Sequence, residues 1–163
     1  MESVNKNKAM INFLLRCPEI QSNPLFFNFA EIENGNNHFI TEKDTIKERY
    51  IDGSMLKQYT FSIASYSPVS HNAIVGTSTV DENMENMEKV QAILDWINKE
   101  EELAQIEDGH YPDFGEDCVV DEMSTLTSDP DVDGIDTSVN PPMARYSIGV
   151  KVMYLDNSKK IGR

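Results

Sequence analysis

The chain has 163 residues, of which 39% are hydrophobic and 26% charged, a composition typical of one globular domain. Its formal net charge of −14 comes from 28 acidic and 14 basic residues. This acidity argues against tight binding of nucleic acid, because clustered Lys and Arg carry phosphate binding. No apolar run approaches the roughly 20 residues that a membrane helix needs, and the polar start of the chain is unlike a signal peptide. We therefore expect a protein that is made and used in a cytoplasm.

The first half of the chain is expected to form one helix followed by strands. The helix spans residues 3–17, where Ser3 or Asn5 can cap it and Pro18 ends it. Strands are expected over residues 25–32, 38–41, 44–51 and 56–66. Turn residues at 34–37 and 52–54 predict two hairpins among these strands, so we expect mostly antiparallel pairing.

The longest helical pattern spans residues 81–106. Apolar side chains recur there at three- and four-residue steps: Met84, Met87, Val90, Leu94 and Ile97. Ile93 and Trp96 widen this apolar face, and most of the opposite face is acidic. We expect a helix that packs behind the sheet, with Trp96 in the core.

Two further strands, over residues 118–126 and 144–155, complete the expected sheet. In the second strand alternate residues from Ala144 to Tyr154 are apolar, and this period of two predicts one buried face. Residues 67–80 and 128–142 are polar and without period, so both are expected to be loops. The predicted fold is a single α+β domain over residues 1–156, with a mostly antiparallel sheet packed against the long central helix and the N-terminal helix. A flexible basic tail over residues 157–163 is expected to follow it.

One acidic stretch has the opening of a calcium-binding loop, with Asp129, Asp131, Asp133 and Gly134 at the required spacing. The twelfth position of that loop is Asn140, where a bidentate Glu is needed. We therefore interpret the stretch as an acidic, solvated loop and expect no metal and no other cofactor.

The residues that most often carry catalysis are scattered along the chain. The three histidines are His38, His71 and His110, and no nucleophile motif accompanies them. The carboxylates close to His110 are typical of a charged turn: Asp113, Glu116 and Asp117. The two cysteines, Cys17 and Cys118, have no spacing typical of a zinc site or a disulfide scaffold. We predict no catalytic residues.

Six segments occur in an order that resembles a family of small tail proteins of phages from Gram-positive hosts. They are NKNKAMINFLL, PLFFNFAEIENGN, KERYIDGSMLKQYTFSI, ENMENMEKVQAILDWI, YPDFGEDC and NPPMARYSIGVKVMYLD, and together they cover most of the chain. Members of this family are described as minor capsid or head–tail joining proteins, and they resemble tail terminators. The resemblance implies an α+β fold and a homo-oligomeric ring, with six subunits as in the family.

The resemblance also implies a role and a set of partners. A tail terminator ring caps the tail tube at full length and gives the head or collar its docking surface. Its partners are the tail tube protein, the sheath protein in a contractile tail, and a head-completion or connector protein where a head is present. The expected location is the head-proximal end of a virion tail, or of a headless phage-tail-like bacteriocin. No membrane contact is expected.

The two predicted loops are our candidate interfaces with such partners. They contain Ser67, His71 and Val80 in the first loop, and Asp129, Asp133 and Pro142 in the second. Both are long for structureless loops in a small domain, which favours ordering by a partner. The alternative role is that of a tail assembly chaperone or another small assembly factor, which would be absent from finished particles.

Overall fold

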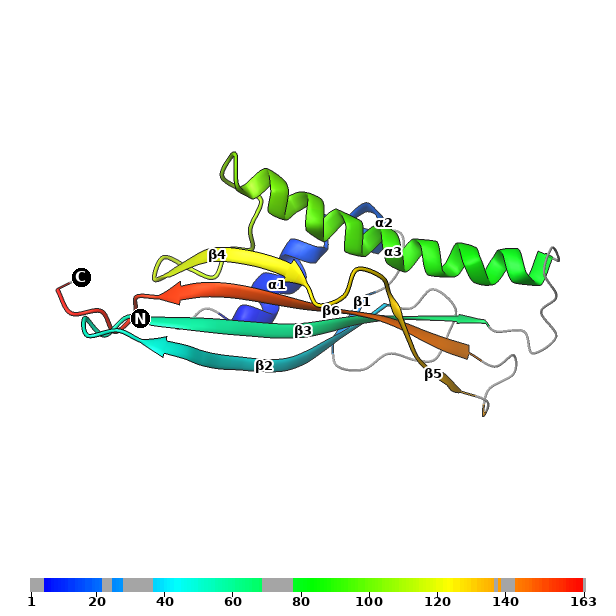
Figure 1. Ribbon diagram of the computed structural model, residues 1–163, viewed down its shortest axis with the longest axis horizontal. Coiled ribbons are helices and arrows are strands. Elements are labelled where there is room, and N and C mark those ends of the chain that lie inside the picture. Colours follow the sequence, from blue (N-terminus) through cyan, green and yellow to red (C-terminus); the bar gives the residue numbers. More distant parts are fainter. Residues whose placement is uncertain are drawn as a thin grey trace.

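The computed structural model describes residues 5–21, 25–27, 37–68, 78–136, 138 and 143–162. The elements in chain order are α1 (Lys6–Leu14), α2 (Pro18–Gln21), β1 (Leu25–Phe27), β2 (Asn37–Arg49), β3 (Met55–Pro68), α3 (Ser78–Ala104), β4 (Cys118–Thr125), β5 (Asp131–Asp136) and β6 (Met143–Asp156). The fold is α+β, as predicted, with α1 and α3 packed against a sheet (Figure 1).

The strand order is β1-β2-β3-β6-β4, and β5 also pairs with β6. Every pair is antiparallel except β1–β2, which is parallel. The predicted hairpin between the first two strands is therefore wrong, and its turn at residues 34–36 lies outside the described residues. The predicted strands at 38–41 and 44–51 are one strand, β2, because a bulge at Glu42 absorbs the extra residue while pairing with β3 continues.

The turn between β2 and β3 confirms the second predicted hairpin. Asp52 Oδ1 accepts hydrogen bonds from the Ser54 backbone N–H at 2.9 Å and from the Ser54 hydroxyl at 2.6 Å. Gly53 has a φ of +90°, a conformation that other residues rarely adopt. Arg49 pairs with Met55 directly across the turn. Local side-chain chemistry thus explains why the chain reverses at this point.

Helix α3 packs on the sheet through Val90, Ile93, Leu94 and Ile97, each at most 2% exposed. The apolar face predicted from the sequence is shifted, because Met87 is 37% exposed; the side chain of Met84 lies outside the described part. Trp96 was predicted to lie in the core, but it is not fully buried. It is partly buried at the edge of the core, and its ring lies 5.1 Å from that of Phe13 in α1. Trp96 therefore joins the two helices above the sheet.

The core lies between these helices and one face of β3 and β6. The predicted alternation in β6 is confirmed, since alternate residues from Ala144 to Tyr154 are buried. Asn5 caps α1 by accepting a hydrogen bond from the Lys8 backbone N–H at 3.2 Å. The same helix contributes buried apolar side chains to the core: Met10, Phe13 and Leu14.

Both predicted loops are partly regular. Residues 128–142 contain β5, which pairs with β6, so the expectation of a structureless loop is wrong there. Residues 67 and 68 end β3 and residues 78–80 begin α3, while residues 69–77 lie outside the described part. Pairing with β6 explains why β5 forms, because that long strand is itself held in the core.

The last residues contact the β2–β3 turn at one end of the elongated domain (Figure 1). The Asn157 N–H donates to the Asp117 carbonyl at 2.7 Å, and the Ile161 N–H donates to the Asp52 carbonyl at 2.5 Å. Lys160 Nζ lies 3.9 Å from Asp52 Oδ2. These contacts join residues 157–161 to Asp52 and Asp117, and the flexibility expected for residues 157–163 stays a prediction.

Candidate functional site

The two long edges of the sheet differ in what covers them. On β4, the Met123 N–H donates to Glu101 Oε2 at 2.9 Å and the Asp121 carbonyl accepts from the Tyr111 hydroxyl at 3.0 Å. Glu101 comes from α3 and Tyr111 from the segment that follows it. Side chains thus form hydrogen bonds with backbone groups on the outer side of β4, where no strand lies next to it. These bonds close this edge to another strand.

The edge formed by β2 is open along its second half. β1 pairs only with residues Asn37, His38 and Phe39, and residues 42–50 are all exposed. Two bulges, at Glu42 and Lys47, interrupt the pairing of β2 with β3. Long exposed edges tend to pair with other chains, and bulges and lysines are common means of limiting that tendency. β2 is therefore the edge most available to a partner.

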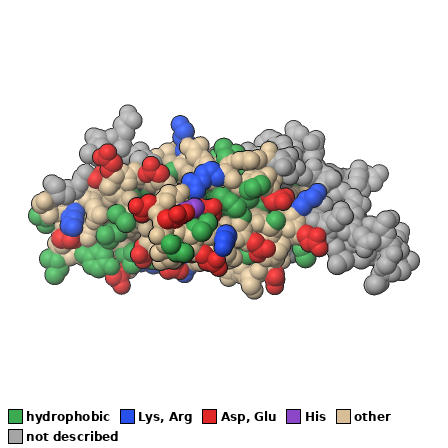
Figure 2. Space-filling model, turned by 90° about the horizontal axis from the view of Figure 1, so that it is seen from above, with side chains coloured by type: hydrophobic (Ala, Val, Ile, Leu, Met, Phe, Trp, Pro, Cys, Tyr) green, Lys and Arg blue, Asp and Glu red, His purple; other side chains and the backbone are tan. Residues whose placement is uncertain are grey.

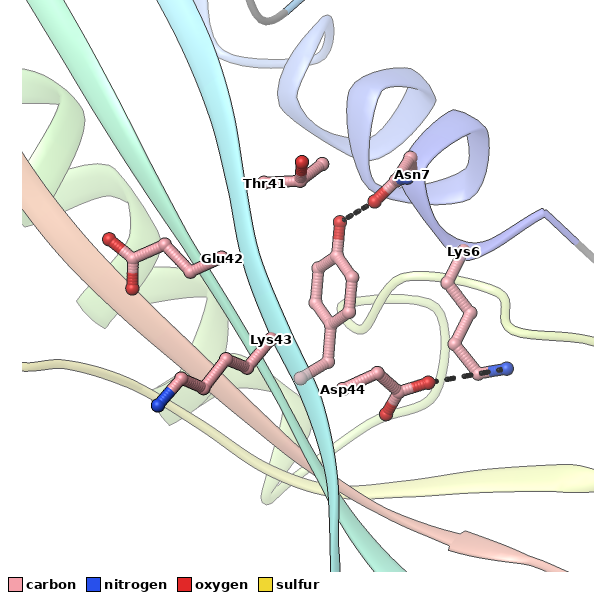
Figure 3. A pocket seen from close by; sticks show the side chains of 7 residues that line it. Lys6, Asn7, Thr41, Glu42, Lys43 and Asp44 are labelled. Carbon is pink, nitrogen blue, oxygen red and sulfur yellow. Dashed lines mark hydrogen bonds and ion pairs between the residues drawn. The ribbon is translucent and has the colours of Figure 1, made fainter.

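A hollow of about 270 Å³ lies between α1 and β2 (Figure 3). The Tyr59 hydroxyl donates to Asn7 Oδ1, and Lys6 Nζ lies 3.9 Å from Asp44 Oδ2. Figure 3 shows the side chains of Glu42 and Lys43 extending away from α1. The polar groups on the α1 side therefore bond to one another.

Asp44 also accepts from the Tyr154 hydroxyl, at 2.7 Å to Oδ1 and 2.9 Å to Oδ2. Burial and this carboxylate raise the pKa of Tyr154, and burial followed by the charge of Asp44 raises the pKa of Tyr59. Both phenols stay protonated at neutral pH. We interpret the network as a structural tie between α1, β2 and β6.

A larger hollow, of about 600 Å³, lies beside the β2–β3 turn, where Arg49, Lys57 and Lys159 contribute to its lining. Lys57 Nζ donates to Asp156 Oδ2 at 2.7 Å. Burial by itself raises the pKa of Asp156, but the hydrogen bonds from Lys57 and Ser158 outweigh it and lower the value to about 2. The carboxylate therefore stays ionised and is a structural partner of Lys57.

His110 lies between two carboxylates beyond the end of α3. Its Nδ1 is 2.8 Å from Glu100 Oε2, and its Nε2 is 2.6 Å from Glu107 Oε1. Hydrogen bonding to Glu107, then to Glu100, raises the pKa of His110. Because both ring nitrogens face acceptors, the site favours the doubly protonated ring. Arg16 Nη2 adds bonds to Glu100 Oε2 at 3.3 Å and to the Gly109 carbonyl at 3.0 Å, so the cluster joins the turn after α1 to this segment.

Sequence analysis had associated His110 with carboxylates that follow it in the chain. The structure pairs it with Glu100 and Glu107 instead. Glu100, on the acidic side of the long helix, is thus part of this cluster. The three-residue spacing of Glu107 and His110 could have indicated their contact from the sequence. The contact between Glu100 and His110 could not be predicted in this way, because it depends on how the chain folds back after α3.

The predicted interface residues are only partly described. Ser67 is the second-last residue of β3, Val80 lies in the first turn of α3 and Asp133 lies in β5, while Asp129 is exposed before β5. His71 and Pro142 lie outside the described residues.

The two predicted loop regions begin at the same end of the sheet. Ser67 in β3 and Ile135 in β5 both pair with Ala144, from opposite sides of β6. The N-terminal end of α3 lies at this end of the domain, away from the β2–β3 turn (Figure 1).

The stretch that resembles the opening of a calcium loop does not form a tight turn, because residues 131–136 are extended in β5. Within the described ranges, no three His, Cys, Asp or Glu side chains are placed to hold a metal ion together. None of the helices that the structure describes is long and apolar enough to cross a membrane.

Sequence reasoning missed the features that distinguish the two edges. Glu101 is one of three consecutive glutamates, and nothing in the sequence marks it as the acceptor for Met123. The chain matches no protein-family model, and no curated protein is similar enough to indicate a relationship.

Proposed function

We propose that this chain is a structural subunit of a phage tail or phage-tail-like particle, acting as a tail terminator without catalytic activity. Copies of the chain assemble into a ring that caps the finished tail tube and offers the docking surface for a head or collar. The tube protein is the first partner. A sheath protein joins it in a contractile tail, and a head-completion protein where a head is present.

The observation that carries the proposal is the exposed second half of β2. Nine consecutive exposed residues, 42–50, run along the edge of a sheet whose opposite edge is closed by Glu101 and Tyr111. A subunit that assembles with its neighbours needs one such accessible edge and a rigid sheet behind it. The six ordered segments that resemble tail terminators supply the specific role, and the α+β fold agrees with that resemblance.

The charge of the chain also suits this role. A ring at the end of a tail tube lets DNA pass without holding it, and a protein with a formal net charge of −14 repels the phosphates. The clusters around Asp44 and His110 have internal partners, which is typical of structural ties.

The decisive experiment is deletion of the gene from the cell that produces the particle, followed by electron microscopy of the tails. A missing terminator should leave tubes of variable and excessive length, and expression of the wild-type chain in trans should restore uniform length. Tails of normal length and normal head or collar attachment in the deletion strain would contradict the proposal.

A second measurement separates the terminator from an assembly chaperone. Mass spectrometry of purified particles should find this chain at a fixed, small copy number, and labelled subunits should lie at one tail end. A chain needed for assembly but missing from purified particles would be a chaperone.

A further inference from the structure

The charge of this chain is unevenly distributed along the sequence. Residues 100–144 contain 14 of the 28 acidic residues and none of the 14 Lys and Arg residues. That segment therefore carries the whole formal charge of −14, and the rest of the chain is neutral. The segment comprises the end of α3, the connection to β4, β4 itself and β5. Figure 2, which views the domain from the α3 side, shows more acidic than basic side chains on that face.

Within the acidic segment, β4 and β5 form one edge of the sheet. Three carboxylates on or just before β4 are exposed and form no ion pair within the described part of the chain: Glu116, Asp121 and Glu122. Exposed apolar side chains accompany them, with Val119 at 55% and Leu126 at 53% exposure. This edge thus presents apolar groups among carboxylates that have no cation of their own.

The opposite edge, β2, has the complementary pattern. Each acidic residue on its exposed half has a partner in the same chain: Glu42 accepts from Ser62, Asp44 from Tyr154, and Glu48 from Tyr50. The cations Lys43, Lys47 and Arg49 form no ion pair among the described residues, and Arg49 Nη1 donates to the sulfur of Met55 at 3.5 Å. Nearby apolar side chains are exposed: Ile46, Tyr50 and Ile51.

We propose that a second copy of this chain binds the β2 edge through its acidic β4 edge, head to tail. This inference deepens the proposed function and rests on it, because it names the two surfaces that join neighbouring subunits. The contact places Lys43, Lys47 and Arg49 of one copy against Glu116, Asp121 and Glu122 of the next, around apolar groups from both.

The geometry favours this arrangement over a twofold contact. β2 and β4 are opposite edges of one sheet, so a β2-to-β4 contact leaves a free surface of each kind for the next copy and can close a ring. A twofold contact through β2 alone would bring the unpaired cations of both copies together. Because backbone groups of β4 are already bonded by Glu101 and Tyr111, side chains make the contact, and the bulges in β2 do not hinder it.

The test reverses the charges of one edge at a time. The first variant carries Lys47→Glu and Arg49→Glu, and the second carries Asp121→Lys and Glu122→Lys. Each should raise the midpoint concentration for self-association about tenfold or more, measured by light scattering and analytical ultracentrifugation. The matched controls reverse exposed charges on α3, with Lys89→Glu and Lys99→Glu, or Glu88→Lys and Asp95→Lys, and should assemble like the wild type. Circular dichroism melts establish that every variant is folded.

Mixing the two edge variants is the decisive part of the experiment. Each reversed edge then faces an edge of opposite charge on the other variant, so the mixture should assemble although neither variant does alone. Rescue of this kind requires two different surfaces on each copy. Folded edge variants that assemble like the wild type, or a mixture that stays monomeric, would overturn the inference; the lysines would then only guard the edge against unspecific pairing.

This outcome is distinguishable from failure of the proposed function. If the wild-type chain associates and the edge variants do so equally well, ring assembly stands and only the choice of edges is wrong. If the wild-type chain stays monomeric at all concentrations, with and without tail tubes, both the ring and the edge contact are wrong.

Discussion

Along β4, side chains from α3 and from the segment after it bond backbone groups that no strand pairs with, whereas residues 42–50 of β2 face solvent. Both strands are edges of the same sheet, so the difference does not come from their pairing partners β6 and β3. It comes from where the helix and its following segment lie. An edge that the chain itself has closed resists pairing with another strand, and an edge left open is accessible to one.

The contrast also exists within β2. Phe39 is fully buried and stacks on Phe61 with ring centroids 4.9 Å apart, whereas Ile46 is 39% exposed. Phe39→Ala should lower the free energy of unfolding by about 3–5 kcal/mol, because it leaves a cavity in the core. Ile46→Ala, the matched control on the same strand, should cost under about 1 kcal/mol. Urea denaturation of both variants measures the difference.

Equal costs for Phe39→Ala and Ile46→Ala would mean that the second half of β2 is as well anchored as the first. The edge would then be less accessible than its exposure suggests.

A substitution in the turn at the end of β2 should have the next largest effect on the free energy of unfolding. A Cβ at Gly53 would lie 2.2 Å from the Lys159 carbonyl oxygen, and the φ of +90° is itself unfavourable for alanine. Gly53→Ala should cost about 2–3 kcal/mol and displace residues 157–162. Gly109→Ala has a similar φ of +94° with no atom within 4 Å of the new Cβ, so it should cost only about 1 kcal/mol.

The comparison of these glycines also tests whether residues 157–162 are flexible. NMR relaxation of their backbone amides should show these residues ordered in the wild type and mobile in Gly53→Ala. If the two variants are equally stable and the tail is mobile in both, the contacts to Asp52 and Asp117 are not held in solution.

How much of this could be predicted from the sequence depends on where the determining contacts lie. The long helix, the β2–β3 turn and the alternation in β6 follow from local patterns, and the structure confirms them within a few residues. β2 looked like two strands because residues 42–50 are exposed on both faces and therefore lack an apolar period. β5 has an acidic, glycine-containing sequence typical of loops, and only its pairing with β6 makes it a strand.

The candidate surfaces were harder to predict for the same reason. The exposure of residues 42–50 depends on which strand lies next to β2. The closure of the other edge depends on Glu101 reaching Met123 across 22 positions in the chain. The acidic bias of residues 100–144 is visible in the sequence, but its meaning appears only once those residues form one edge of the sheet.

Removing the hydrogen bond between Glu101 and the Met123 N–H should have an effect of intermediate size on the free energy of unfolding. Glu101→Ala leaves the N–H of the fully buried Met123 without its acceptor, which should cost about 1–3 kcal/mol. Glu102→Ala is the matched control, because that side chain is 71% exposed and should contribute little. Hydrogen exchange should speed up at Met123 in the first variant only. No change at that amide would mean that Glu101 does not close the edge.

The smallest expected effect is a pH dependence that affects the β4 edge alone. Glu107 and Glu100 raise the pKa of His110 above its ordinary value of 6.5, and Arg16 is the only cation with a described contact to the cluster. Because the folded state binds the proton more tightly, the stabilisation from His110 is fully present below about pH 6.5 and is lost as the pH rises through the raised folded-state pKa.

His110 holds the segment from which Tyr111 bonds to β4, so loss of its proton should loosen that edge and leave β2 unchanged. The measurement is the free energy of unfolding of the wild type minus that of His110→Gln, at intervals from pH 5.5 to about 9. This difference should fall with rising pH, and hydrogen exchange compared between the two proteins at each pH should place the change in β4. A difference that stays constant, or a change that appears equally in β2, would show that the histidine cluster does not govern the closed edge.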